Sequence, residues 1–155
     1  MRFSSFLSFT MLLVLSMSLT ARPPAQHEHD HHDLHGHAVE PLVLDDGQRW
    51  STDLALRSGM EGIRDIFDRY HGAFHDGNMS AADFQVVAAG VNERVSFIFS
   101  QCALPPDADA ELHKLLASAL MAASALEGAG PDDGMRQLHA VLLSYGEFFD
   151  HPDWD

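Results

Sequence analysis

Residues 51–74 read STDLALRSGMEGIRDIFDRYHGAF, and their apolar side chains recur at alternating spacings of four and three. That spacing places one narrow apolar face along an α-helix. The face consists of Leu56, Met60, Ile63, Phe67, Tyr70 and Phe74. Ser51, Thr52 and Asp53 are residue types that favour the N-terminal cap of a helix. We therefore expect a helix that starts near these residues, ends at the turn of residues 76–78 and buries this face.

Two glycines interrupt this expected helix on either side of Met60. Gly59 and Gly62 each weaken a helix by about 1 kcal/mol relative to alanine. Close approach of a neighbouring element is the most direct compensation for that loss. We therefore expect another element to come close beside Met60.

Three further helices follow the same logic. Ser80 with Asp83 three residues later predicts a capping box at the start of the second helix, and Pro106 suits the first turn of the third. The apolar positions of these helices are Phe84, Val87, Val91, Val95, Ile98 and Cys102; then Leu112, Leu116, Ala119, Ala123 and Leu126; then Met135, Leu138, Leu142, Tyr145 and Phe149, before a stop at His151-Pro152. No strand pattern competes. The expected fold is all-α, an up-down-up-down four-helix bundle.

The N-terminal residues 1–21 predict a secretory signal peptide. Arg2 precedes an apolar stretch at residues 6–19, and small residues follow it. That stretch is shorter than the roughly 20 residues that span a bilayer. We expect cleavage, a periplasmic or secreted protein, and no membrane insertion after cleavage.

The rest of the chain divides at the turn predicted by Asp46-Gly47. Residues 22–47 contain prolines and a histidine run, which predict a disordered His-rich tail and linker. Residues 48–155 are expected to form the four-helix domain, a length that suits one hydrophobic core.

The charge of the chain argues against two classes of partner. The net charge is −14, and removal of residues 1–21 takes away one arginine and no acid, which leaves −15. Nucleic acids and anionic membranes need basic patches, which this chain lacks in sequence. The acidity favours cations as partners. The alternative is that the acidic residues only keep the protein soluble.

A histidine run is the strongest chemical signal in the sequence. Six of the eleven histidines fall within eleven residues: His27, His29, His31, His32, His35 and His37. Neutral imidazole is a common ligand for copper, zinc and nickel. Interleaved Glu28, Asp30 and Asp33 can accept imidazole N–H bonds and raise the basicity of the ligands. A tail has no core, so packing does not explain these histidines. We expect the run to bind metal ions, with low selectivity because it offers no prebuilt pocket.

A second candidate site is expected in the bundle itself. Up-down topology brings five residues with soft or imidazole ligands into one half of the bundle: Met60, Cys102, His113, His139 and His151. Thioether, thiolate and imidazole suit copper, particularly Cu(I). The alternatives are that Met60 fills the core, that Cys102 is an inert buried thiol, and that the histidines face solvent. His71 and His75, with Met79, belong to the opposite end, where they either hold one ion or complement a helix terminus.

Four segments carry a resemblance to known proteins. They are residues 42–53 (LVLDDGQRWSTD), 56–64 (LRSGMEGIR), 102–113 (CALPPDADAELH) and 145–154 (YGEFFDHPDW). Together they resemble a small family of exported proteobacterial helical proteins, some labelled DnrO-like, which implies export and a helical domain without an established active site. The bundle also resembles cytochrome b562, a likeness that implies non-covalent haem held by Met60 and His139.

These patterns support one leading hypothesis and two alternatives. The leading hypothesis is an exported protein that binds or buffers metal ions, with copper favoured, zinc or nickel next, and an unknown protein partner. The alternatives are a haem-binding or electron-transfer bundle and a structural or interaction module without a cofactor. No nucleophile elbow or phosphate loop is present, so we expect no enzyme.

Overall fold

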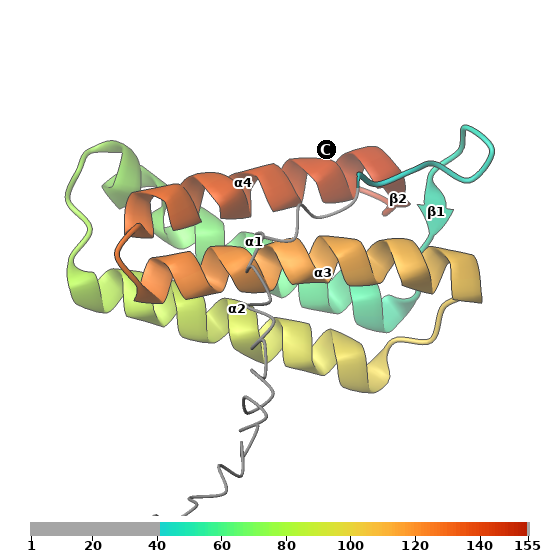
Figure 1. Ribbon diagram of the computed structural model, residues 1–155, viewed down its shortest axis with the longest axis horizontal. Helices are drawn as coiled ribbons and strands as arrows, with labels where there is room; N and C mark the ends of the chain where they lie inside the picture. The colour runs from blue at the N-terminus through green and yellow to red at the C-terminus, as the bar shows by residue number, and fades with distance from the viewer. Residues whose placement is uncertain (1–40, 155) are drawn as a thin grey trace, which may run out of the picture. The chain divides into compact units, whose positions relative to one another are not determined.

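The computed structural model describes residues 41–154, and four helices account for most of them (Figure 1). The helices are α1 (Leu54–His75), α2 (Ala81–Gln101), α3 (Pro106–Glu127) and α4 (Pro131–Phe148), with two short strands, β1 (Trp50–Ser51) and β2 (Phe149–Asp150). The all-α expectation is confirmed. The predicted signal peptide, residues 1–21, and the histidine run lie outside the described residues.

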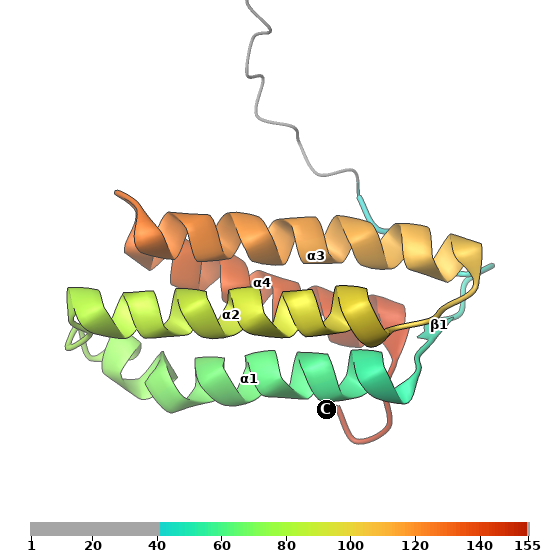
Figure 2. The same cartoon turned by 90° about the horizontal axis from the view of Figure 1, so that it is seen from below.

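The helices pack as a four-helix bundle. α1 contacts α2 and α4, and α3 contacts the same two helices, as Figures 1 and 2 show from two directions. Short connections join consecutive helices. No helix within residues 41–154 is long and apolar enough to cross a membrane.

The helix starts follow the local signals in the sequence. Asp53 caps α1, and its carboxylate accepts a hydrogen bond from the Leu56 amide. Ser80 and Asp83 form the predicted capping box of α2, in which each side chain accepts from the other residue's backbone amide. Pro106 stands in the first turn of α3, where its missing N–H costs nothing.

The core is built from the apolar faces of all four helices. In α1, the predicted positions Leu56, Met60, Ile63 and Phe67 are buried, while Tyr70 and Phe74 pack partly buried against the core. The helical periodicity therefore identified the buried face correctly.

The glycines beside Met60 are sites of close approach between α1 and α2. A Cβ built on Gly59 would lie 2.3 Å from Cγ1 of Ile98, and one on Gly62 would lie 2.6 Å from Nε of Arg94. Both distances are shorter than van der Waals contact. The expectation that another element comes close beside Met60 is confirmed, and that element is α2.

The residues before α1 are tied to the bundle by hydrogen bonds. Asp46 and Gly47 have positive φ values, and Asp45 and Gln48 exchange backbone hydrogen bonds, so the predicted turn is present. Upstream of it, the Val43 amide donates to the buried Glu111 carboxylate on α3 at 3.0 Å. The Val43–Glu111 bond attaches the segment to the domain.

The expectation of no β-structure is wrong at one place. Trp50 pairs with Phe149 and Ser51 with Asp150 in a parallel two-stranded ladder. The Thr52 hydroxyl extends it by donating to the Asp150 carbonyl at 2.6 Å. Two-residue strands leave no alternating pattern in the sequence, and this pair joins segments about a hundred residues apart.

Candidate functional site

Two of the predicted ligands, Cys102 and His113, line one small cavity at the α2–α3 end of the bundle. The cavity has a volume of about 230 Å³. Its walls are Ile98, Phe99, Cys102, Asp109, Leu112, His113 and Leu116. The structure therefore brings a thiol, an imidazole and a carboxylate to one place.

The Cys102 thiol is held in its protonated form. Burial raises its pKa to about 12, and the nearby carboxylates of Asp53 and Asp109 add to the rise because they disfavour a second negative charge. The thiol also hydrogen-bonds to Asp53. Since the thiolate is the form that binds metals, this environment favours a structural role for Cys102.

Asp53 is the residue that organises this end of the bundle. One carboxylate oxygen accepts from the Leu56 amide at 2.7 Å, and the other accepts from the Ala103 amide at 2.8 Å. Burial alone would raise its pKa, but these backbone hydrogen bonds outweigh burial and lower it. An ionised Asp53 thus joins the start of α1 to the α2–α3 connection.

His113 lies at the rim of the cavity with an exposed ring. Its Nδ1 is 2.8 Å from the Asp109 carbonyl oxygen and 3.4 Å from the Asp109 carboxylate, and its ring centre is 5.3 Å from that of Phe99. These contacts hold the ring beside its own helix.

Met60 belongs to the core and does not line this cavity. Its side chain is fully buried among the apolar residues of the bundle. The structure therefore favours the packing alternative for Met60 over a shared soft site with Cys102 and His113.

His139 lies against α1 and does not line the cavity of Cys102 and His113. Its exposed ring stacks on Phe67 of α1, with ring centres 5.3 Å apart, and the His71 ring centre is 6.0 Å away. Since Phe67 is seven residues from Met60, about 10 Å along α1, Met60 and His139 do not meet as a haem pair would. The first half of α4 packs beside the second half of α1, which separates His139 from Cys102.

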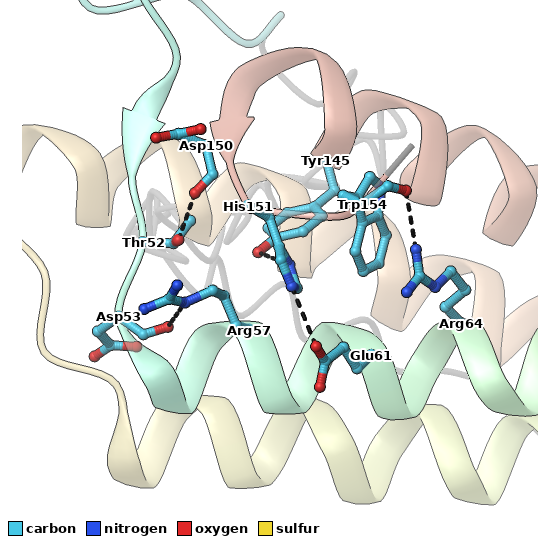
Figure 3. Close-up of polar contacts among 9 residues, drawn as sticks. All are labelled: Thr52, Asp53, Arg57, Glu61, Arg64, Tyr145, Asp150, His151 and Trp154. Atoms are coloured by element: carbon cyan, nitrogen blue, oxygen red, sulfur yellow. Dashed lines mark hydrogen bonds and ion pairs between the residues drawn. The ribbon is translucent and has the colours of Figure 1, made fainter.

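His151 is buried in a hydrogen-bonded cluster that the sequence did not reveal (Figure 3). Its Nε2 is 3.3 Å from the Glu61 carboxylate, and its Nδ1 is 3.0 Å from the Tyr145 hydroxyl. An ionised carboxylate only accepts, so Nε2 carries the proton and Nδ1 accepts from Tyr145. Burial lowers the pKa of His151, although Glu61 opposes the change. Burial likewise raises the pKa of Tyr145.

Trp154 closes this cluster against solvent. Its ring centre lies 4.6 Å from that of Tyr145, and the Arg64 guanidinium sits 4.2 Å from its ring centre while donating to its carbonyl oxygen. A Cβ on Gly146 would come within 2.7 Å of the indole. Gly146 and the terminal aromatic residues could have hinted at this arrangement, but the sequence analysis did not use them.

The remaining predicted ligands are the histidines of the run. His27, His29, His31, His32, His35 and His37 lie outside the described residues. Within residues 41–154, no group of three or more His, Cys, Asp or Glu side chains is arranged to hold a metal ion as it stands.

Comparison with known proteins adds no assignment. No protein family, curated protein or solved structure matches this chain at a significant level. Its function is therefore inferred from its own residues.

Proposed function

We propose that this chain is an exported metal-ion-binding protein, in which the histidine run of residues 27–37 captures Cu²⁺, Zn²⁺ or Ni²⁺ and the four-helix domain carries the run. The observation behind the proposal is the density of imidazoles, six in eleven residues, interleaved with three carboxylates. Cu²⁺ stands first because it binds N and O ligands most tightly among the divalent first-row metals.

The described domain supports giving the run the main role. Met60 is enclosed by apolar neighbours, and the Cys102 thiol is held protonated. Neither side chain is therefore in a state that favours metal coordination. Copper capture by the run needs no contribution from them.

Export and topology complete the proposal. The apolar stretch at residues 6–19 supports a signal peptide and a periplasmic or secreted location, in line with the resemblance to exported DnrO-like proteins. The short connections between consecutive helices support an up-down-up-down order, because a short loop leaves the next helix antiparallel to the last.

The proposal is tested by replacing the six histidines of the run with glutamine in the otherwise complete protein. Calorimetric titration with Cu²⁺, Zn²⁺ and Ni²⁺ should show loss of most of the bound metal, while circular dichroism stays unchanged. Binding by the parent protein should weaken below about pH 6, where imidazoles take up protons. The control is His113→Gln, which keeps the run intact. Unchanged stoichiometry in the six-histidine variant would refute the proposal.

The haem alternative is not favoured by the position of its two ligands. Met60 is fully buried, and His139 is exposed beside Phe67. The same titrations address it, because haem binding would add a Soret band to the absorption spectrum. An interaction module without a cofactor would bind neither metal nor haem in its folded core.

A further inference from the structure

Three histidines lie together on the surface where α1 and α4 meet. His71 is at the centre, with its ring centre 6.3 Å from that of His75 and 6.0 Å from that of His139. All three side chains are exposed. His71 and His75 are one turn apart on α1, whereas His139 comes from α4, so only the tertiary structure assembles the group.

The separations are slightly longer than those of imidazoles that share one ion. With a metal–nitrogen bond of about 2.0 Å, ring centres lie about 3 Å from the ion, so two rings at a tetrahedral angle have centres about 5 Å apart. Each observed pair therefore has to close by about 1 Å, which rotation of the exposed side chains can supply. Histidines four residues apart on a helix are an established way to hold zinc from one face. His139 supplies the third ligand from the neighbouring helix.

The rings need reorientation before they converge. His71 and His75 are nearly perpendicular, His71 and His139 are tilted by 47°, and both His71 and His139 lie against the ring of Phe67. Exposed side chains change rotamer within nanoseconds, so this adjustment requires no movement of the helices. Phe67, only 4% exposed, forms an apolar floor beneath the rings.

We propose that His71, His75 and His139 form a metal site that links α1 to α4 and takes Zn²⁺, Cu²⁺ or Ni²⁺. The site is separate from the histidine run and does not depend on it. Because His139 and the α1 pair come from different helices, the complete site exists only in the folded protein. A bound ion therefore stabilises the fold by mass action.

Thermal unfolding with Zn²⁺ separates this site from the run. Metal held by the run alone binds folded and unfolded chains alike and leaves the melting temperature unchanged, whereas the cross-helix site raises it. We expect Zn²⁺ to raise the Tm of the complete protein by several degrees. The rise should disappear in His71→Gln and shrink in His139→Gln, and it should persist in the matched control His113→Gln, another exposed histidine.

The melting temperatures of the variants distinguish the cross-helix site from its alternatives. No rise in the parent protein, or a full rise in His71→Gln, overturns the proposal. A rise that His71→Gln removes but His139→Gln leaves whole assigns the ion to α1 alone and overturns the cross-helix site. The variant without the six run histidines should keep the full rise, so failure of the run and failure of this site are distinguishable. Side-chain ¹H–¹⁵N spectra should show Zn²⁺-dependent shifts at the three imidazoles.

Discussion

His151 shows how one buried side chain connects the fold to pH. Burial lowers its pKa below the ordinary value of 6.5, with Arg57 and Arg64 acting in the same direction and Glu61 against it. The unfolded chain therefore binds the proton more readily. Stability from the neutral ring is complete above about pH 6.5 and is lost as the pH falls through and below that value.

We predict that the free energy of unfolding falls between pH 7.5 and pH 5.5, and that His151→Gln removes much of this dependence. The variant should also be less stable at pH 7.5, because Tyr145 loses its ring acceptor. Urea denaturation at several pH values measures both effects. His113→Gln is the control and should keep the slope of the parent. A variant at position 151 with the full parental slope would show that another group is responsible.

At the scale of the helices, some glycines allow two helices to come close and others do not. The sequence alone does not tell the two kinds apart. A Cβ on Gly134 of α4 would lie 2.9 Å from the Ala122 carbonyl oxygen and 2.8 Å from the Leu126 amide nitrogen, both backbone atoms of α3. Gly72 on α1 has no such neighbour within 4 Å. One glycine therefore permits helix packing, and the other only weakens its helix.

We predict opposite effects for the same substitution at these two positions. Gly134→Ala should destabilise the protein by about 1–3 kcal/mol, because backbone atoms cannot move aside cheaply. Gly72→Ala should stabilise it by up to about 1 kcal/mol through helix propensity. Urea denaturation of the two variants gives the comparison. Equal stabilisation by both would contradict the close contact of α3 and α4.

At the scale of the whole domain, the C-terminal residues tie the two ends of the described chain together. β2 pairs with β1, His151 contacts Glu61 of α1, and Arg64 holds Trp154. Trp154 also packs on Tyr145 and donates to the Leu142 carbonyl oxygen at 3.3 Å. This closure restrains α4 against α1.

We predict that Trp154→Ala costs about 1–3 kcal/mol, because it uncovers Tyr145 and His151 together. Leu143 lies next to Leu142 on α4, and its side chain is 63% exposed. Leu143→Ala should therefore change the free energy of unfolding by no more than about 0.5 kcal/mol. Thermal unfolding measures the difference, and hydrogen exchange should rise at residues 149–154 only in the tryptophan variant. Equal stability of the two variants would mean that the C-terminal closure contributes nothing.

The sequence by itself determined the helices, the side-chain caps of α1 and α2, and the buried faces. A helical period, the Ser80–Asp83 capping box and Pro106 act through neighbours within one or two turns, so their effect does not depend on the rest of the fold. Gly59 and Gly62 also indicated that a neighbouring element comes close beside Met60. The histidine run is equally a property of sequence, because its chemistry lies in composition.

Only the tertiary structure decided which side chains meet. The sequence grouped His139 with Cys102 in one half of the bundle, and the structure places its ring beside Phe67 and His71. The pairing of β1 with β2 and the His151 cluster were likewise invisible in the sequence. The reason is geometric: each residue turns a helix by about 100°, so a small change in register or in helix order gives a side chain new neighbours without altering the periodicity.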